Sequence, residues 1–173
     1  MEERIFQSED LRKINPNSVN TLRMITIIDD KGEPHVAAVL FRCGISDLCV
    51  DNFLSGGGAA IVEPKTGIII SLLQDHHDKK FIYHPKSNVK ILGMQIDNWQ
   101  DYVGFALELA KVYPAMRYAG WDIVKDSQGK MVCIEGNAGA GVLGHEGLMP
   151  LGTKALFDAF VKFDKGVNFL EYY

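Results

Sequence analysis

Asp122, Glu135 and Asn137 are the residues of this 173-residue sequence whose types and spacing best suit chemistry. They lie within residues 118–137, where two apolar runs flank a polar segment that contains glycine. This pattern predicts a β-hairpin. Side chains alternate between the two faces of a strand, so Glu135 and Asn137 are expected on the same face.

The register of this hairpin decides whether the two carboxylates meet. We expect the turn to be centred between Gln128 and Gly129. The cross-strand pairs that follow from this centre are Lys125 with Val132, Val124 with Cys133 and Asp122 with Glu135. A slip of one residue would move Glu135 to the other face and separate the two acids.

The expected acidic pair indicates a divalent cation. Like charges directly opposite one another destabilise a sheet or force one carboxyl group to keep its proton. Two carboxylates and one amide supply oxygen ligands, and so small a set suits Mg²⁺ (or Mn²⁺) that also keeps water or phosphate oxygens. The alternative is that Asp122 and Glu135 both point into solvent from a one-sided sheet.

Two arginines are expected on a second hairpin. Residues 19–28 and 36–43 are β-rich and flank residues 29–34, which contain the glycine and proline of a turn. This hairpin brings Arg23 and Arg42 close together on one face. Their planar guanidinium groups suit a phosphate or carboxylate between them, and the alternative is two exposed surface arginines.

Three successive glycines, Gly56, Gly57 and Gly58, follow shortly after Asn52. Glycine loses much conformational entropy when it is ordered, so such a run indicates a loop whose backbone approaches another group. Successive backbone N–H groups in that loop would bind an anion. A flexible surface loop has the same composition.

The remaining pattern predicts one α+β domain over residues 1–173. The expected elements are a short helix or turn over 5–14, a hairpin from 60–64 and 67–73, a helix over 97–116 and a last helix over about 153–163. Together with the two hairpins above, they predict a mainly antiparallel β-sheet flanked by helices.

Composition restricts the partners and the location. The net charge of −4 and the scattered basic residues argue against a nucleic-acid partner. The longest apolar stretch, residues 67–73, is too short for membrane insertion. The three cysteines lack the paired spacing of a zinc site, and the charged N-terminus does not resemble a secretory signal, so we expect reduced thiols and a cytoplasmic location.

Two other patterns suggest different chemistry. Residues 75–80 contain a His-His-Asp sequence, but neighbouring side chains of an extended segment point apart, which disfavours a metal site. Residues 139–144 match G-x-G-x-x-G. A dinucleotide-binding fold also needs a preceding strand, a helix that opens inside the motif and an acid on a second parallel strand, whereas this chain offers hairpins.

These motifs resemble those of the ATP-grasp superfamily and, more narrowly, the sugar-transfer-associated ATP-grasp family that is found with polysaccharide biosynthesis genes. The residues that carry the resemblance are 18–23, 51–53, 56–58, 84–85, Trp99, 120–123 and 135–137. They span nearly the whole chain in the order of the family.

The resemblance implies the C-terminal lobe of an ATP-grasp module that uses ATP and Mg²⁺ (or Mn²⁺). Asp122, Glu135 and Asn137 would hold the metal, while Arg23 and Arg42 would act catalytically by stabilising the transferring phosphoryl group. The residues implied for the substrate and phosphate loop are Asn20, Asn52, Gly56, Gly57 and Gly58. His84 is a tentative substrate-side residue, and its neighbours Ser87 and Asn88 depart from the family pattern.

The implied function is carboxylate activation, in which a small carboxylate attacks the γ-phosphate of ATP and a nucleophile captures the acyl phosphate. The family's N-terminal nucleotide lobe, with its phosphate-binding lysine and its lid, has no counterpart in these residues. We therefore expect the chain to be inactive alone as a ligase and to form a homo-oligomer or to need that lobe. The alternative is a non-catalytic domain that binds a nucleotide or an anionic sugar in the same pocket.

Overall fold

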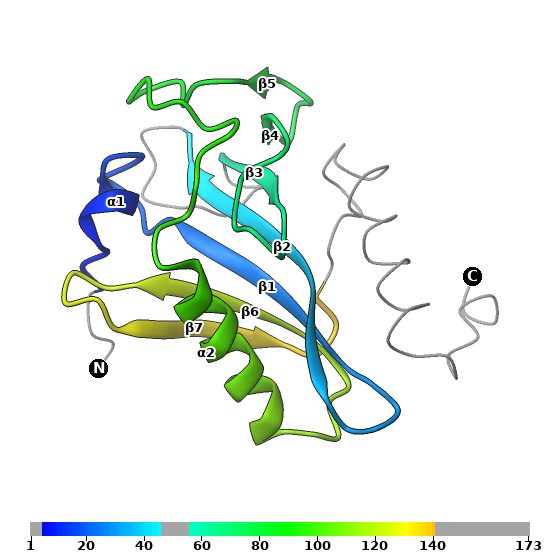
Figure 1. Cartoon of the computed structure of the whole chain (residues 1–173). Coiled ribbons are helices and arrows are strands. Elements are labelled where there is room, and N and C mark those ends of the chain that lie inside the picture. The colour runs from blue at the N-terminus through cyan, green and yellow to red at the C-terminus, as the bar shows by residue number, and fades with distance from the viewer. Residues whose placement is uncertain (1–4, 46–55, 141–173) are drawn as a thin grey trace.

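The computed structural model describes residues 5–45 and 56–140. The elements in chain order are α1 (Glu9–Arg12), β1 (Thr21–Ile28), β2 (Pro34–Gly44), β3 (Gly57–Val62), β4 (Leu73–Asp75), β5 (Lys80–Phe81), α2 (Trp99–Val112), β6 (Tyr118–Lys125) and β7 (Met131–Asn137). The predicted α+β class with a mainly antiparallel sheet is confirmed (Figure 1).

The strands form a single seven-stranded sheet in the order β5-β4-β3-β2-β1-β6-β7. Each strand pairs antiparallel with its neighbours. Two of the three hairpins that the sequence predicted, β1–β2 and β6–β7, become adjacent because β1 also pairs with β6. This contact joins segments that are far apart in the sequence, and it brings the arginines of one hairpin beside the acids of the other.

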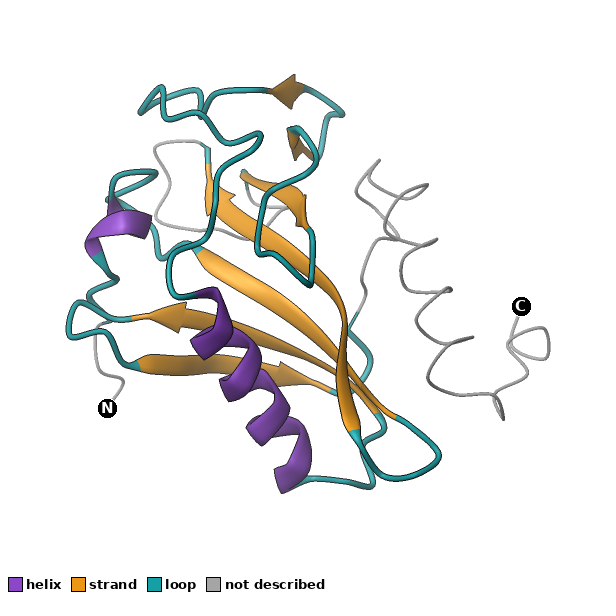
Figure 2. Cartoon of the chain, in the orientation of Figure 1, coloured by secondary structure: helices purple, strands orange, loops and turns teal. Residues whose placement is uncertain are grey.

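Helix α2 covers one face of the sheet (Figure 2). Its buried residues Trp99, Tyr102, Ala106 and Ala110 recur every three or four positions, and the first three pack into the main core. The strand residues that face this helix include Leu22, Met24, Phe41, Trp121 and Ile123. The helix ends at Val112, earlier than the sequence predicted, because Tyr113 leaves the helical conformation before Pro114.

The opposite face of the sheet holds a second, smaller apolar cluster. Its buried members on the strands include Ile25, Ile27, Leu40 and Ile61. Side chains alternate along each strand, so a strand residue two positions from a member of this cluster points to the same face of the sheet. Arg23 is two positions from Ile25, and Arg42 is two positions from Leu40, so both arginines lie on the face opposite α2.

Three of the turns are built in the same way. An aspartate Oδ1 accepts hydrogen bonds from the backbone N–H groups two and four positions later, at 2.8 to 2.9 Å, and the residue three positions later has a positive φ. The three aspartates are Asp29, Asp75 and Asp126, and the positive-φ residues are Gly32, Asp78 and Gly129. The aspartate therefore replaces backbone hydrogen bonds that the tight turn leaves open.

Some expectations lie outside the described residues. These are the role of Asn52, the last helix over about 153–163 and most of the G-x-G-x-x-G segment over 139–144. Among the helices of the described part, neither is long and apolar enough to cross a membrane.

Candidate functional site

The β6–β7 hairpin places Glu135 opposite Asp122, as the sequence predicted, but by a different register. The turn is one residue tighter than expected, because Asp126 N–H donates to the carbonyl of Lys130 at 2.9 Å. The predicted pairs near the turn are therefore wrong. The observed pairs there are Lys125 with Met131, Val124 with Val132 and Ile123 with Cys133.

A β-bulge at Ile134 compensates for the tighter turn. The register shifts between Asp122 and Ile123, so that Ile134 is the additional residue of β7. Without this bulge, Asp122 would lie opposite Ile134, and Glu135 would point toward α2. The bulge thus puts both carboxylates on the face opposite the helix. Asn137 pairs with Gly120 on that same face.

Trp121 and Gly136 fix the strand pair next to the bulge. The indole of Trp121 is buried, and its Nε1–H donates to Thr26 Oγ1 at 2.8 Å across β1. A Cβ at Gly136 would lie 2.7 Å from Cζ3 of this indole, so only glycine allows the ring to lie across β7. Position 120 must also be glycine, because Ala140 packs directly against Gly120 on the other face of the sheet.

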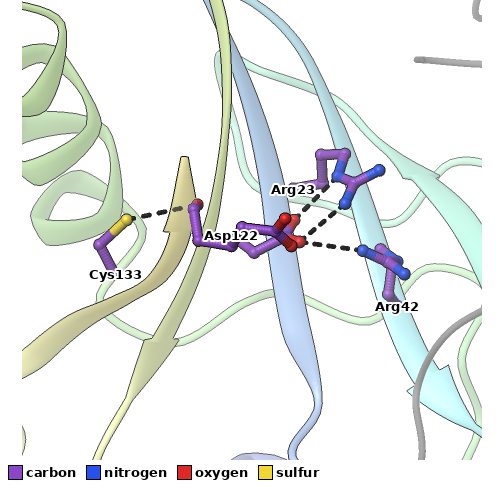
Figure 3. Close-up of polar contacts among 5 residues, drawn as sticks. Arg23, Arg42, Asp122 and Cys133 are labelled. Carbon is purple, nitrogen blue, oxygen red and sulfur yellow. Dashed lines mark hydrogen bonds and ion pairs between the residues drawn. The ribbon is translucent and has the colours of Figure 1, made fainter. Parts of the chain in front are cut away.

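Arg23 and Arg42 both form ion pairs with Asp122 (Figure 3). The guanidinium of Arg23 is bidentate, with Nε 2.8 Å from Oδ1 and a terminal nitrogen 2.7 Å from Oδ2. A terminal nitrogen of Arg42 donates to Oδ2 at 3.1 Å. The Asp122 side chain is 7% exposed. The anion that the sequence analysis expected between the arginines is therefore supplied by the protein itself.

The donors expected for a metal are present on this face. A carboxylate has about four acceptor positions, and three of those on Asp122 are taken by guanidinium N–H groups. Glu135 is exposed and Asn137 is partly exposed, and neither side chain has a hydrogen-bond partner among the described residues. Two carboxylates and an amide are oxygen donors of the kind that Mg²⁺ and Mn²⁺ accept, so the set fits such an ion. Their role as ligands remains a prediction.

Asn20 lies in the interior and not in a substrate loop. Its Nδ2 donates to Gln7 Oε1 at 3.0 Å and to the carbonyls of Leu11 and Asn15 at 2.8 and 3.1 Å. The residue has no exposed surface. Asn20 therefore ties the N-terminal turn to β1, and the proposed contact with substrate does not agree with this position.

The glycine run is only partly a loop. Gly57 and Gly58 belong to β3 and pair with Gly44 and Cys43 of β2, whereas Gly56 precedes the strand with φ 101°. A Cβ at Gly58 would lie 3.0 Å from side-chain carbons of Ile45 and Leu73. The expected phosphate loop over all three glycines is therefore corrected: two of them are buried strand residues that allow close packing.

His84 is also an internal residue. Its Nε2–H donates to the carbonyl of Gly44 at 2.8 Å, while Nδ1 lies 3.2 Å from the backbone N–H of Ser87. The ring is 1% exposed, and burial lowers its pKa below the usual 6.5. The neutral imidazole thus joins β2 to the segment after β5. This position does not support the tentative substrate-side role.

Cys133 lies beside the site, and the sequence analysis predicted it only to be a reduced thiol. Its Sγ lies 3.4 Å from the backbone carbonyl of Glu135, beside the bulge (Figure 3). Burial, followed by the nearby carboxylate of Asp122, raises the pKa of this thiol above its usual value. Cys133 is therefore a protonated packing residue at neutral pH and not an activated nucleophile.

Comparison with protein families gives a match that covers most of the chain. The sequence matches the family model described as sugar-transfer associated ATP-grasp over residues 1–154. That range contains the two arginines, the acidic pair and Asn137. No curated protein matches the chain at a significant level.

Proposed function

Because the chain belongs to the sugar-transfer associated ATP-grasp family, we propose that the sheet face opposite α2 binds Mg²⁺ and the phosphates of ATP for carboxylate activation. The observation that supports this proposal most is the cluster of Arg23, Arg42 and Asp122, with Glu135 directly opposite Asp122. Cationic forks and oxygen donors for a metal then lie side by side on a rigid sheet.

Each side chain has a distinct task in this proposal. Asp122, Glu135 and Asn137 hold Mg²⁺ through oxygen atoms. Arg23 and Arg42 donate N–H groups to phosphoryl oxygens, where charge must be stabilised during transfer. Bound Mg²⁺ would supply charge neutralisation on the β- and γ-phosphates. Because four neighbouring strands, β2, β1, β6 and β7, carry these groups, their spacing is set by backbone hydrogen bonds and not by a loop.

The proposed reaction is the formation of an acyl phosphate. An oxygen of a small carboxylate attacks the γ-phosphorus, the bond to the β-phosphate oxygen breaks, and ADP leaves with that electron pair. An amine or another nucleophile then displaces inorganic phosphate from the acyl group. The family is described as associated with sugar transfer, so we propose that the product is used in the synthesis of polysaccharides or other cell-surface sugars.

The test is a nuclear magnetic resonance titration with Mn²⁺-ATP. Paramagnetic broadening detects weak binding, and we expect it first at the amides of Asp122, Glu135 and Asn137. Glu135→Gln should reduce the broadening, because it removes one anionic ligand. Glu108→Gln is the matched control, since Glu108 is an exposed glutamate on α2 that pairs with Lys111. Broadening that is absent from β6 and β7, or that is unchanged in Glu135→Gln, would argue against the proposed site.

A second function uses the same sheet face without turnover. Here the arginine pair would bind a nucleotide or an anionic sugar as a non-catalytic recognition site. Release of ADP and phosphate that depends on an added carboxylate separates the two functions. Binding that is equally strong with and without divalent metal would favour the anionic sugar.

A further inference from the structure

Asp122 has two sets of expected partners that compete for its carboxylate oxygens. Its carboxylate is one of the expected metal ligands, yet guanidinium N–H groups already take three of about four acceptor positions. The geometry points to an exchange, an inference that rests on the proposed function: the arginines hold Asp122 until a phosphate-like anion accepts hydrogen bonds from their N–H groups. Divalent metal and anion then bind this face with positive coupling, and metal alone binds weakly.

The charge balance supports this exchange. Two guanidinium groups contact one carboxylate in a cluster whose side chains are 7 to 17% exposed. A dication that approaches Asp122 meets the positive charge of these guanidinium groups at short range, where low exposure limits screening. Glu135 offsets the charge only from an exposed position. An anion of charge −2 reverses the balance.

Hydrogen-bond geometry leads to the same result. A rotation of Asp122 toward a metal beside Glu135 would break at least part of its bidentate contact with Arg23. A tetrahedral anion offers several acceptor oxygens in return, and guanidinium forks match it well. The arginines therefore exchange one anionic partner for another, so that no buried cation is left unpaired.

Coupling of this kind is reciprocal and measurable. Typical couplings between two sites change affinity by about 5- to 150-fold. We expect saturating sulfate to tighten Mn²⁺ binding by about 10-fold or more relative to chloride at equal ionic strength. Sulfate is the probe because it fills guanidinium forks while it complexes Mn²⁺ only weakly. Bound Mn²⁺ is measured by electron paramagnetic resonance on the full chain.

Variants of Arg42 test the exchange directly. Arg42→Met removes one competitor for Asp122, so Mn²⁺ alone should bind about 10-fold tighter than to wild type, and sulfate should then add little. Arg12→Met is the charge-matched control on α1 and should behave like wild type. Arg23→Met, which removes the bidentate partner, should also tighten Mn²⁺ binding and provides a second variant if Arg42→Met does not fold.

The outcomes separate this inference from the proposed function. Equal Mn²⁺ affinity of the wild type in sulfate and chloride, or no tighter binding in either arginine variant, overturns the coupling even where Mn²⁺-ATP binds. Absence of Mn²⁺ broadening at β6 and β7 in every condition, Mn²⁺-ATP included, overturns the proposed function and the coupling with it.

Discussion

At the scale of single residues, polar side chains in this protein differ in whether a ligand could replace their partners. Asp122 is held by the side chains of Arg23 and Arg42 on one face of the sheet, and side chains can change partners without a change in the backbone. Asn20 and His84 are held by backbone carbonyls that no ligand can displace without unfolding the local chain. This difference separates the candidate site from the buried framework.

His84 provides a prediction on pH dependence. Burial lowers its pKa below 6.5 in the folded protein, so the unfolded chain binds more protons as the pH falls below 6.5. The contribution of His84 to stability is therefore complete above pH 6.5 and is lost as the pH falls toward its folded pKa. We expect the free energy of unfolding, measured by urea titration, to decrease between pH 7 and pH 5 in the wild type.

His84→Gln is the matched variant, because its amide can still donate to the carbonyl of Gly44 but does not titrate. The difference in stability between wild type and variant should shrink as the pH falls from 7 to 5. The other four histidines remain in both proteins, so their titration cancels in this comparison. A difference that stays constant over this range would show that His84 does not titrate on unfolding.

At the scale of elements, the orientation of Asp122 and Glu135 in the β6–β7 hairpin depends on packing against Trp121. The tighter turn and the bulge compensate each other, so the pairing beyond the bulge is the one that carries Asp122 and Glu135. The indole over Gly136 secures that part of the ladder.

Two glycine substitutions test this view of the hairpin. Gly136→Ala places a methyl group 2.7 Å from Cζ3 of Trp121, and we expect a loss of about 1–3 kcal/mol of stability from this overpacking. Gly104→Ala is the control in α2, where a Cβ meets no atom within 4 Å. It should stabilise the protein by about 0.5–1 kcal/mol through helix propensity. Urea unfolding measures both, and a neutral Gly136→Ala would contradict the role given to the indole.

At the scale of the whole molecule, one buried cluster joins the N-terminal turn, α2 and the sheet. It includes Leu11 of α1, Trp99 of α2 and Val124 of β6. Lys125 links the same three parts through polar contacts, with Nζ 3.4 Å from Asp10 Oδ2 and 2.9 Å from Asn98 Oδ1. The described residues are therefore expected to unfold as one cooperative unit.

Substitutions of Lys125 test whether these parts unfold cooperatively. Lys125→Ala removes a buried side chain that packs between the three elements, and we expect it to lower the free energy of unfolding by about 1–3 kcal/mol. Lys125→Met keeps the apolar volume, and the Asp10 carboxylate that it leaves is 25% exposed and can be hydrated, so its loss should be smaller than that of Lys125→Ala. Circular dichroism and tryptophan fluorescence should give coincident transitions in both variants. Separate transitions would show that α1 and α2 are not coupled through this cluster.

The sequence by itself determined the local elements and their faces. Period-two alternation and turn residues predicted the β1–β2 and β6–β7 hairpins, and helical spacing predicted α2. The opposition of Asp122 and Glu135 also followed, although through a register that was wrong near the turn. The repeated aspartate turn was a readable signal: Asp126 four positions before Lys130, with Gly129 between them, predicts the tighter turn.

Only the tertiary structure decided which partners these side chains have. Arg23 and Arg42 meet Asp122 across 99 and 80 positions of sequence, because β1 pairs with β6 as well as with β2. Local periodicity carries no information about which strands become neighbours, since that choice depends on the burial of both sheet faces. For the same reason Asn20 and His84, which resemble site residues in the sequence, became parts of the interior, while the arginines and Asp122 became a single charged cluster.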